Sequence, residues 1–248
     1  MKKIIYILLT ILIVSCSSED ANDCFQNAGT TIQQEVSVSN FNKILVNRDI
    51  NLVIKEASEF SVVIETGEYL MNDVEAKVVD GQLQLTDKNT CNFVRDHGLT
   101  TIYVSAPDIT EIRSSTQHSI SSDGTLNYSN LRLLSEDVNG VGTITSGEFT
   151  LNVNSDRLRI ISNNLSSFEI TGQVENLFVR FFSGIGRFEG RNLIAQNVEV
   201  YHRGGNDMIV NPQEELTGNL YGTGNLISTN RPDVINVIQH YTGELIFE

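Results

Sequence analysis

Short apolar runs, many with a polar residue between neighbouring apolar ones, follow one another from Val36 onward. They lie at 44–46, 50–54, 62–64, 83–85 and 102–104 and are rich in Val and Ile. Turn residues such as Asp80-Gly81 and Ala106-Pro107-Asp108 separate them. Because strand side chains point alternately to the two faces of a sheet, these runs predict short strands. Segment 74–79 fits a strand or a short irregular piece, and no segment shows a convincing helical period, so we expect an all-β chain.

The second half of the chain repeats with a period near 20 residues. The echoed segments are Phe168-Glu169-Ile170, Phe188-Glu189-Gly190, Met208-Ile209-Val210, Leu226-Ile227-Ser228 and Leu245-Ile246-Phe247. Gly-x-Gly turns such as Gly184-Ile185-Gly186 and Gly222-Thr223-Gly224 lie between them, and we expect positive φ at these corners. A fixed period of this length predicts a β-solenoid whose coils of about 20 residues stack from Ile109 onward. An antiparallel sandwich is the alternative.

Four aromatic residues recur at a constant spacing of 20: Phe181, Tyr201, Tyr221 and Tyr241. If this column faces solvent, it is a rigid stripe suited to a sugar ring or a protein partner. If it faces inward, it is a stacked ladder within the core. The polar residues Glu199, Asn219 and Gln239 stand two positions earlier and share its face, which favours the outward orientation.

The first fifteen residues resemble a bacterial lipoprotein signal peptide. Lys2 and Lys3 precede an apolar run at 4–14, which is too short for a stable membrane span. Ile13-Val14-Ser15-Cys16 resembles a lipobox, so we predict cleavage before Cys16 and acylation (palmitate among the chains) of that residue. An ordinary signal peptide with a chance cysteine and a bare membrane anchor are the alternatives. We expect residues 1–15 as signal, 16–35 as lipidated tether and 36–248 as the folded domain, with Ser17 suited to outer-membrane sorting.

Charge and cysteine content narrow the partners. Loss of Lys2 and Lys3 with the signal lowers the net charge from −14 to −16, so nucleic acid and anionic lipid headgroups are poor partners. With Cys16 acylated, Cys24 and Cys91 remain, and two cysteines outside the cytoplasm favour a disulfide. Two free thiols are the alternative.

The residues that carry chemistry do not form a recognisable active site. Strand-forming residues follow the Gly-x-Gly stretches, whereas a phosphate loop needs a helix there. Glu169 and Glu189 would lie on adjacent coils as a possible acid/base pair, but solvated surface glutamates are the simpler interpretation. His97, His118, His202 and His240 have no metal-ligand spacing, and we expect surface or turn roles for them. We therefore predict no enzyme activity, no cofactor and no metal.

Several motifs together resemble one known family. They are Asp23-Cys24-Phe25-Gln26-Asn27-Ala28-Gly29, Phe41-Asn42-Lys43-Ile44-Leu45-Val46, Cys91-Asn92-Phe93-Val94-Arg95, Ala106-Pro107-Asp108-Ile109 and Gly218-Asn219-Leu220-Tyr221-Gly222-Thr223-Gly224-Asn225-Leu226. This pattern is similar to the putative auto-transporter adhesin, head GIN domain family, and covers most of residues 24–248. The resemblance implies a right-handed parallel β-helix, no established catalysis and a proposed role in adhesion. His118, Asn164 and Arg203 depart from it, because family members often have small residues there.

We therefore expect a lipid-anchored β-solenoid on the outer membrane, exposed at the cell surface, that binds a glycan or protein ligand. A structural envelope protein and a polysaccharide-cleaving enzyme are the alternatives.

Overall fold

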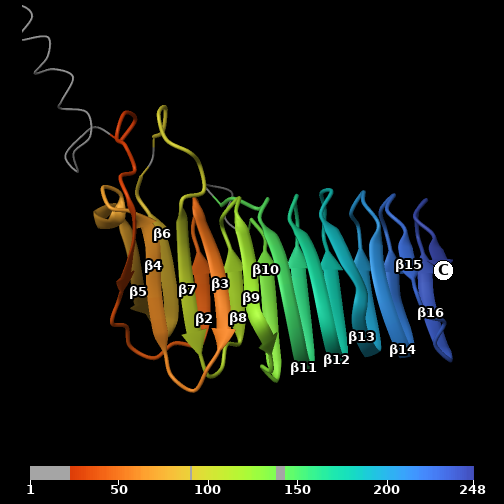
Figure 1. Cartoon of the computed structure of the whole chain (residues 1–248). Coiled ribbons are helices and arrows are strands. Elements are labelled where there is room, and N and C mark those ends of the chain that lie inside the picture. The colour runs from red at the N-terminus through yellow and green to blue at the C-terminus, as the bar shows by residue number, and fades with distance from the viewer. Residues whose placement is uncertain (1–22, 90, 138–142) are drawn as a thin grey trace, which may run out of the picture.

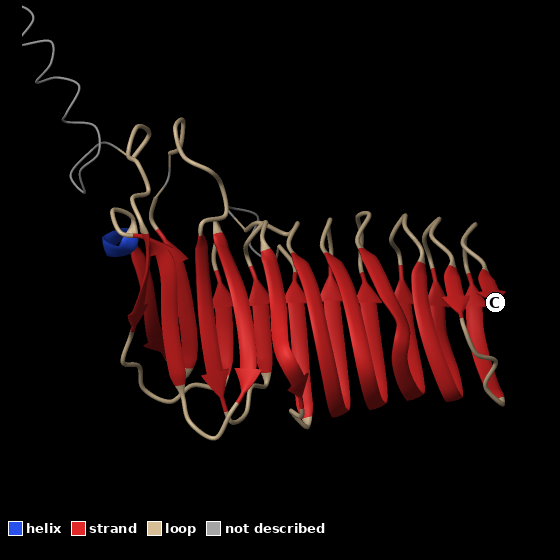
Figure 2. Cartoon of the chain, viewed as in Figure 1, coloured by secondary structure: helices blue, strands red, loops and turns tan. Residues whose placement is uncertain are grey.

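The computed structural model describes residues 23–89, 91–137 and 143–248. It confirms the all-β prediction, because the seventeen strands found in these residues join one sheet. The single helical element of the described residues is the three-residue 3-10 turn η1 (Met71–Asp73). The strands stand side by side along an elongated body, with the first strands at one end and the C-terminus at the other (Figures 1 and 2).

The N-terminal part of the body mixes parallel and antiparallel pairing. Its strands are β1 (Thr31–Glu35), β2 (Lys43–Val46), β3 (Ile50–Glu56), β4 (Ser61–Gly67), β5 (Val74–Val79), β6 (Gln82–Asp87), β7 (Thr100–Ala106), β8 (Glu111–Ser114), β9 (Ser119–Leu126) and β10 (Asn130–Ser135). The five predicted strands are thus confirmed, and segment 74–79 is a strand. Strand β4 runs antiparallel to β1 and β7, and β5 runs antiparallel to β6. The two-residue turn Asp80-Gly81 joins β5 to β6 as a hairpin.

From β11 onward every strand pair is parallel. The strands are β11 (Glu148–Ser162), β12 (Ser167–Phe181), β13 (Arg187–His202), β14 (Met208–Leu220), β15 (Leu226–Ser228), β16 (Val234–Gln239) and β17 (Leu245–Phe247). Phe149 pairs with Phe168, Phe168 with Phe188, and Phe188 with Met208. The echoed segments therefore lie beside one another, and the Gly-x-Gly stretches 184–186 and 222–224 lie in the turns between strands.

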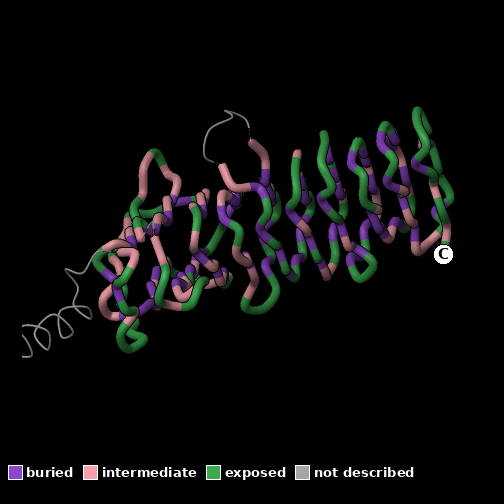
Figure 3. Tube along the Cα trace, turned by 90° about the horizontal axis from the view of Figure 1, so that it is seen from above, coloured by how far each residue is buried: buried purple, intermediate pink, exposed green. Residues whose placement is uncertain are grey.

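The core runs along the inside of these paired strands. Buried and exposed positions alternate along β11, and Figure 3 shows repeated changes between buried and exposed colours along the trace. The rings of Phe149 and Phe168 stack with centroids 4.7 Å apart, and Phe188 on the next strand is fully buried. Each strand covers the apolar row of its neighbour, so the core is continuous although a single strand could not bury its own side chains.

The glycines of the turns are required mainly because consecutive turns lie in contact. Gly184 has the expected positive φ of 85°. At Gly224, in contrast, an added Cβ would lie 2.0 Å from the backbone oxygen of Asn206, in the turn before. Since that oxygen belongs to the backbone, it cannot move aside as a flexible side chain could. Close approach, and not backbone conformation alone, explains the glycine pattern.

The predicted disulfide is confirmed, because Cys24 and Cys91 are bonded. Strand β1 lies within the range expected for the tether and pairs with β4, so part of that range is folded against the domain. The predicted signal peptide and Cys16 lie outside the described residues. No helix within the described ranges is long and apolar enough to span a membrane.

Candidate functional site

The predicted aromatic column does not form a column, and Phe181 is a core residue with 1% of its surface exposed. Between the paired positions Glu169–Glu189 and Gly172–Leu193, β13 contains one residue more than β12. Phe181 consequently pairs with His202, whereas Tyr201 pairs with Arg180. Because side chains alternate along a strand, a shift of one residue places Phe181 and Tyr201 on opposite faces. The prediction that Phe181 belongs to an exposed stripe was wrong for this reason.

A different set of rings forms the exposed row. Phe182, Tyr201, Tyr221 and His240 contact one another in sequence, with centroid separations of 5.2, 5.1 and 4.1 Å. We call these four residues the aromatic ladder. Phe182 and Tyr221 are 41% and 39% exposed. Tyr241 is 64% exposed but has no ring contact with the ladder among those found in the described residues. Two of the predicted residues, Tyr201 and Tyr221, thus belong to the ladder.

Phe182 and His240 were not predicted from the sequence. Phe181 and Phe182 are adjacent, so their rings lie on opposite faces. The spacing of 20 points to Phe181, which is buried, and not to Phe182, which is exposed. For His240, the pairing of Leu220 with Gln239 was needed, since it places the following residue of each strand side by side. Neither relationship is visible without the register of the strands.

A shallow groove of about 350 Å³ lies beside the ladder on the outer face of β12, β13, β14 and β16. The residues that line it through their exposed or half-buried side chains are Arg180, Phe182, Glu199, Tyr201, Thr217, Asn219, Asn236 and Ile238. Aromatic and aliphatic groups therefore alternate with amides, a hydroxyl and a charged pair. We call this hollow the ladder groove.

Charge in the ladder groove is balanced. Arg180 and Glu199 form an ion pair at 3.0 Å, with both side chains about half exposed. His240 Nε2 lies 2.9 Å from Asn219 Oδ1, which holds the imidazole ring against Tyr221. The groove therefore presents hydrogen-bonding groups without a net charge, on a chain that is otherwise strongly acidic. Such a surface suits a polar, largely uncharged ligand segment.

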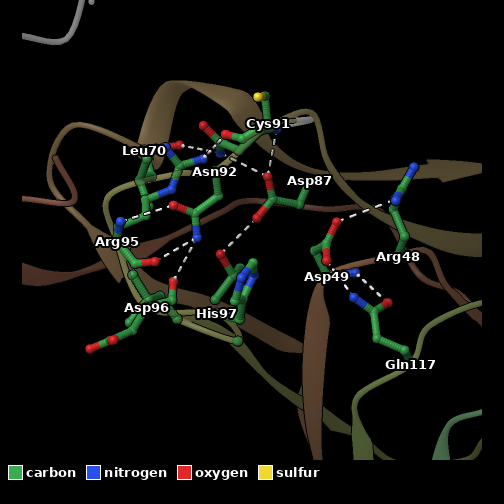
Figure 4. Close-up of a pocket in the computed structure, with 14 residues that line it drawn as sticks. Arg48, Asp49, Leu70, Asp87, Cys91, Asn92, Arg95, Asp96, His97 and Gln117 are labelled. Atoms are coloured by element: carbon green, nitrogen blue, oxygen red, sulfur yellow. Dashed lines mark hydrogen bonds and ion pairs between the residues drawn. The ribbon is translucent and has the colours of Figure 1, made fainter. Parts of the chain in front are cut away.

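A second pocket, of about 280 Å³, lies beside the disulfide at the other end of the body. Figure 4 shows Asn92 and Arg95 joined by dashed lines, whereas those of Asp87 run to other groups of the pocket. Asn92 Oδ1 accepts hydrogen bonds from the backbone N–H groups of Val94 and Arg95, and Arg95 donates to the carbonyl oxygens of Asp23, Gln26 and Cys91. The polar groups of this pocket thus hold the Cys91 loop in place.

Asp87 is the buried carboxylate of this second pocket. Its two oxygens accept hydrogen bonds from Asn89 and from the Thr100 hydroxyl. Burial raises the pKa of Asp87 above its usual range, although these hydrogen bonds oppose the effect. Since both carboxylate oxygens are already engaged by the protein, we interpret this pocket as structural and the ladder groove as the better ligand site.

The two glutamates considered as an acid/base pair are neighbours, because Glu169 pairs with Glu189 on the next strand. Arg187 lies 3.3 Å and Arg191 3.9 Å from the Glu189 carboxylate. The basic partner that catalysis would need is therefore present, but Glu169 is exposed on an open strand face and does not lie in a cleft. Both arginines belong to β13, like Glu189, so they offset the charge of Glu189 where it lies beside Glu169.

The expectation of surface or turn positions for all four histidines was wrong for His202. It is fully buried, and its Nδ1 accepts a hydrogen bond from the backbone N–H of Gly204. The register shift that buries Phe181 brings His202 beside it, with the two rings edge to face at 6.2 Å. The described part of the chain contains no cluster of three or more His, Cys, Asp or Glu side chains placed to hold a metal ion.

Comparison with known proteins agrees with this architecture. A family model described as "Putative auto-transporter adhesin, head GIN domain" matches residues 40–232. The crystal structure of a putative adhesin from Bacteroides fragilis is 19% identical, with a TM-score of 0.78, over 88% of this chain and 97% of that one. A putative adhesin from Parabacteroides distasonis has 15% identity and a TM-score of 0.64 over 89% and 98% of the two chains.

A putative lipid binding protein from Parabacteroides distasonis has 14% identity and a TM-score of 0.62 over 89% of this chain and 97% of its own. At these identities the likeness shows a common fold and no more. The comparison with curated proteins found no match.

Proposed function

Because the chain belongs to the putative auto-transporter adhesin, head GIN domain family, we propose that it is a lipid-anchored, non-catalytic binding protein of the bacterial cell surface. Its body is a right-handed parallel β-helix that holds the aromatic ladder and the ladder groove away from the membrane. The parallel pairing of β11 to β17, with equivalent residues about 20 apart, supports this architecture.

The observation that carries the proposal is the exposed aromatic ladder, which lies beside a groove lined with hydrogen-bonding groups and without net charge. Isolated exposed apolar residues are common, whereas rings in contact across four strands with an adjacent hollow mark a recognition surface. Tyr201 and Tyr221 have few rotatable bonds, so ordering them on a ligand costs little conformational entropy.

The way the rings contact one another favours a protein ligand over a sugar. A sugar ring stacks on the free face of an aromatic ring. In the ladder, Tyr221 and His240 lie 9° from parallel at 4.1 Å, so each covers a face of the other. The Asn219 and Asn236 amides of the groove lie next to these rings. Those groups suit the polar backbone and side chains of another protein.

A binding screen tests the proposal. The mature protein is presented to arrays of extracellular-matrix proteins and of glycans, together with the variants Tyr221→Ala and Tyr103→Ala. Tyr103 is the matched control, because it is 37% exposed on β7, outside the ladder. We expect a protein ligand whose affinity falls at least about tenfold in Tyr221→Ala and is unchanged in Tyr103→Ala. Equal affinities for both variants, or binding to glycans alone, would contradict the proposal.

Lipid attachment at Cys16 is the other component of the proposal. The variant Cys16→Ala removes the acylation site, so the protein should be released from the membrane fraction or remain as an uncleaved precursor. Fractionation after metabolic labelling with a fatty acid measures both outcomes. Mature Cys16→Ala protein that still resists extraction from the membrane would disprove the anchor.

A further inference from the structure

The last strands of the body leave an unpaired edge. Strand β16 pairs with β14 on one side, and β17 pairs with β15. Among the described residues no strand pairs with the outer edge of either. This edge lies at the opposite end of the body from β1 and the disulfide loop (Figure 1). A row of unpaired backbone N–H and C=O groups is a template for another strand.

Strand β16 lacks the usual protection of an edge strand. Natural edges are commonly blocked by charged side chains, proline or a bulge. The sequence of β16, Val-Ile-Asn-Val-Ile-Gln, contains neither charge nor proline. Val234 and Ile238 on the outer face are 52% and 50% exposed. Ile235 pairs with the buried Leu216 and so belongs to the core side, yet it is 37% exposed. The apolar core is therefore open to solvent at this end.

The pattern of β16 reads the same in both directions around Asn236. Two apolar residues precede it and two follow it. In an antiparallel pair, residues opposite one another lie on the same face of the sheet, so core-side residues must meet core-side residues. A two-fold axis at Asn236 satisfies this condition: Ile235 meets Val237 of a second copy, and Val234 meets Ile238. Each contact across the axis is then between like residues, and isologous contacts of this kind are typical of two-fold dimers.

We propose that β16 is a homophilic docking strand, which pairs antiparallel with β16 of a second copy of this chain with Asn236 opposite Asn236. An uncharged β16 suits a second copy of this chain as its partner. Two chains with a net charge of −14 or lower repel each other unless the surfaces in contact are neutral. Contact at the far ends also keeps the acidic bodies apart.

The geometry of this pair has a consequence for adhesion. An antiparallel pair with a two-fold axis at β16 reverses the direction of the two bodies, so their N-terminal ends point away from each other. Lipid anchors at those ends would therefore lie in two different membranes. This step rests on the proposed anchoring and surface location, and it makes cell-to-cell contact the kind of adhesion that β16 supports.

Single cysteine substitutions test the strand register directly. Opposite Cα atoms in an antiparallel pair lie about 4.5–5.5 Å apart, within the range for a disulfide. Asn236→Cys should therefore form a covalent dimer under mild oxidation of the mature lipoprotein in detergent. Val234→Cys is the matched control on the same strand and face. In this register its two copies lie about 13 Å apart, too far to bond. Cross-linking at 234 instead of 236, or at neither position, would refute the proposed pairing.

A vesicle assay tests the pairing in its membrane setting. Two populations of phosphatidylethanolamine–phosphatidylcholine vesicles carry the full lipidated protein, and their clustering is measured by light scattering. Val234→Lys places a charge on the edge and should raise the protein density needed for clustering at least about tenfold. Ile185→Lys is the control, since Ile185 is 57% exposed in a turn away from the edge. Equal clustering by both variants would overturn the homophilic role.

These results are separable from the ladder proposal. Tyr221→Ala should leave cross-linking at Asn236→Cys intact. If no foreign ligand binds the ladder but the cross-link forms, the proposed ladder function fails and the docking strand stands.

Discussion

The ring of Tyr221 lies almost parallel to the imidazole of His240, with centroids 4.1 Å apart and an angle of 9° between the planes. Tyr221 directly follows β14 and His240 directly follows β16, so the contact crosses from one repeat to the next. The two residues differ in type and are 19 positions apart in the chain. The ladder is thus a product of strand register and not of sequence identity between repeats.

Substitution of Tyr221 and of Phe181 should have opposite consequences. Tyr221→Ala removes partly exposed ring contacts and should lower the free energy of unfolding by only about 1 kcal/mol. Phe181→Ala creates a cavity in the core, because Phe181 is 1% exposed, and should cost about 3–5 kcal/mol. Urea unfolding of both variants measures the difference. A large loss for Tyr221→Ala would make the ladder a structural element.

Much of the fold is predictable from the sequence because strand alternation and the echo between Phe168 and Phe188 are local patterns. The register of the strands is not predictable in this way. One additional residue in β13, between Glu189 and Leu193, shifts every later pairing between β12 and β13 by one position. That addition lies among Gly190, Arg191 and Asn192, inside one continuous strand, so it does not interrupt the strand. Which rings are exposed depends on this shift in register. Tyr201 and Tyr221 were therefore predicted as part of the candidate site, whereas Phe182 and His240 were not. The antiparallel pairs of β4 with β1 and β7 are long-range contacts, and nothing in the residues themselves indicates their direction. The β5–β6 pair is local, and its two-residue Asp80-Gly81 turn is a hairpin signal that the sequence does contain.

The contact between consecutive turns predicts a position-dependent response to alanine. In Gly224→Ala the new methyl group would lie 2.0 Å from the Asn206 carbonyl oxygen, so the turns must separate. We expect a loss of about 1–3 kcal/mol in the free energy of unfolding. Gly205→Ala is the matched control from the preceding turn, where the nearest atoms lie 3.4 Å or more away. Thermal unfolding compares the melting temperatures of the two variants. Similar melting temperatures would show that the turns do not pack as described.

The disulfide should stabilise the domain through the loop that it closes. Cys24 and Cys91 are 67 residues apart, and the chain-entropy model gives about 4 kcal/mol for a loop of this length. We expect the double variant Cys24→Ser/Cys91→Ser to lose about 2–4 kcal/mol, measured by urea unfolding. The aromatic ladder lies far from this loop, so ligand binding by the folded double variant should be unchanged. A variant as stable as the oxidised protein would mean that the hydrogen bonds of Arg95 alone hold the loop.

His202 should make the stability of the protein depend on pH below neutrality. Burial lowers the pKa of His202 below its usual value, while the nearby Asp207 and a backbone hydrogen bond with Asn206 oppose this effect. Its Nε2 is buried without a hydrogen-bond partner among the described residues, so the imidazolium form gains no compensating contact there.

The direction of the pH effect follows from the lowered pKa of the folded state. In the unfolded chain the ring binds a proton near pH 6.5, whereas in the folded chain it does so only at lower pH. Between these two values the unfolded state binds more protons, so the free energy of unfolding falls as the pH falls, by up to about 1.4 kcal/mol per pH unit. The non-titrating variant His202→Leu should lose this component and show a shallower decline from pH 7 to pH 5.

Comparison with an exposed histidine isolates this contribution, because other groups titrate over the same interval. His97→Leu is a suitable control, since His97 is exposed in the loop near the disulfide. Urea unfolding at several pH values, with wild type, His202→Leu and His97→Leu measured together, gives three slopes. We expect the slope to change in His202→Leu alone. Equal slopes for wild type and His202→Leu would show that the buried ring is protonated in the folded protein as readily as in the unfolded chain.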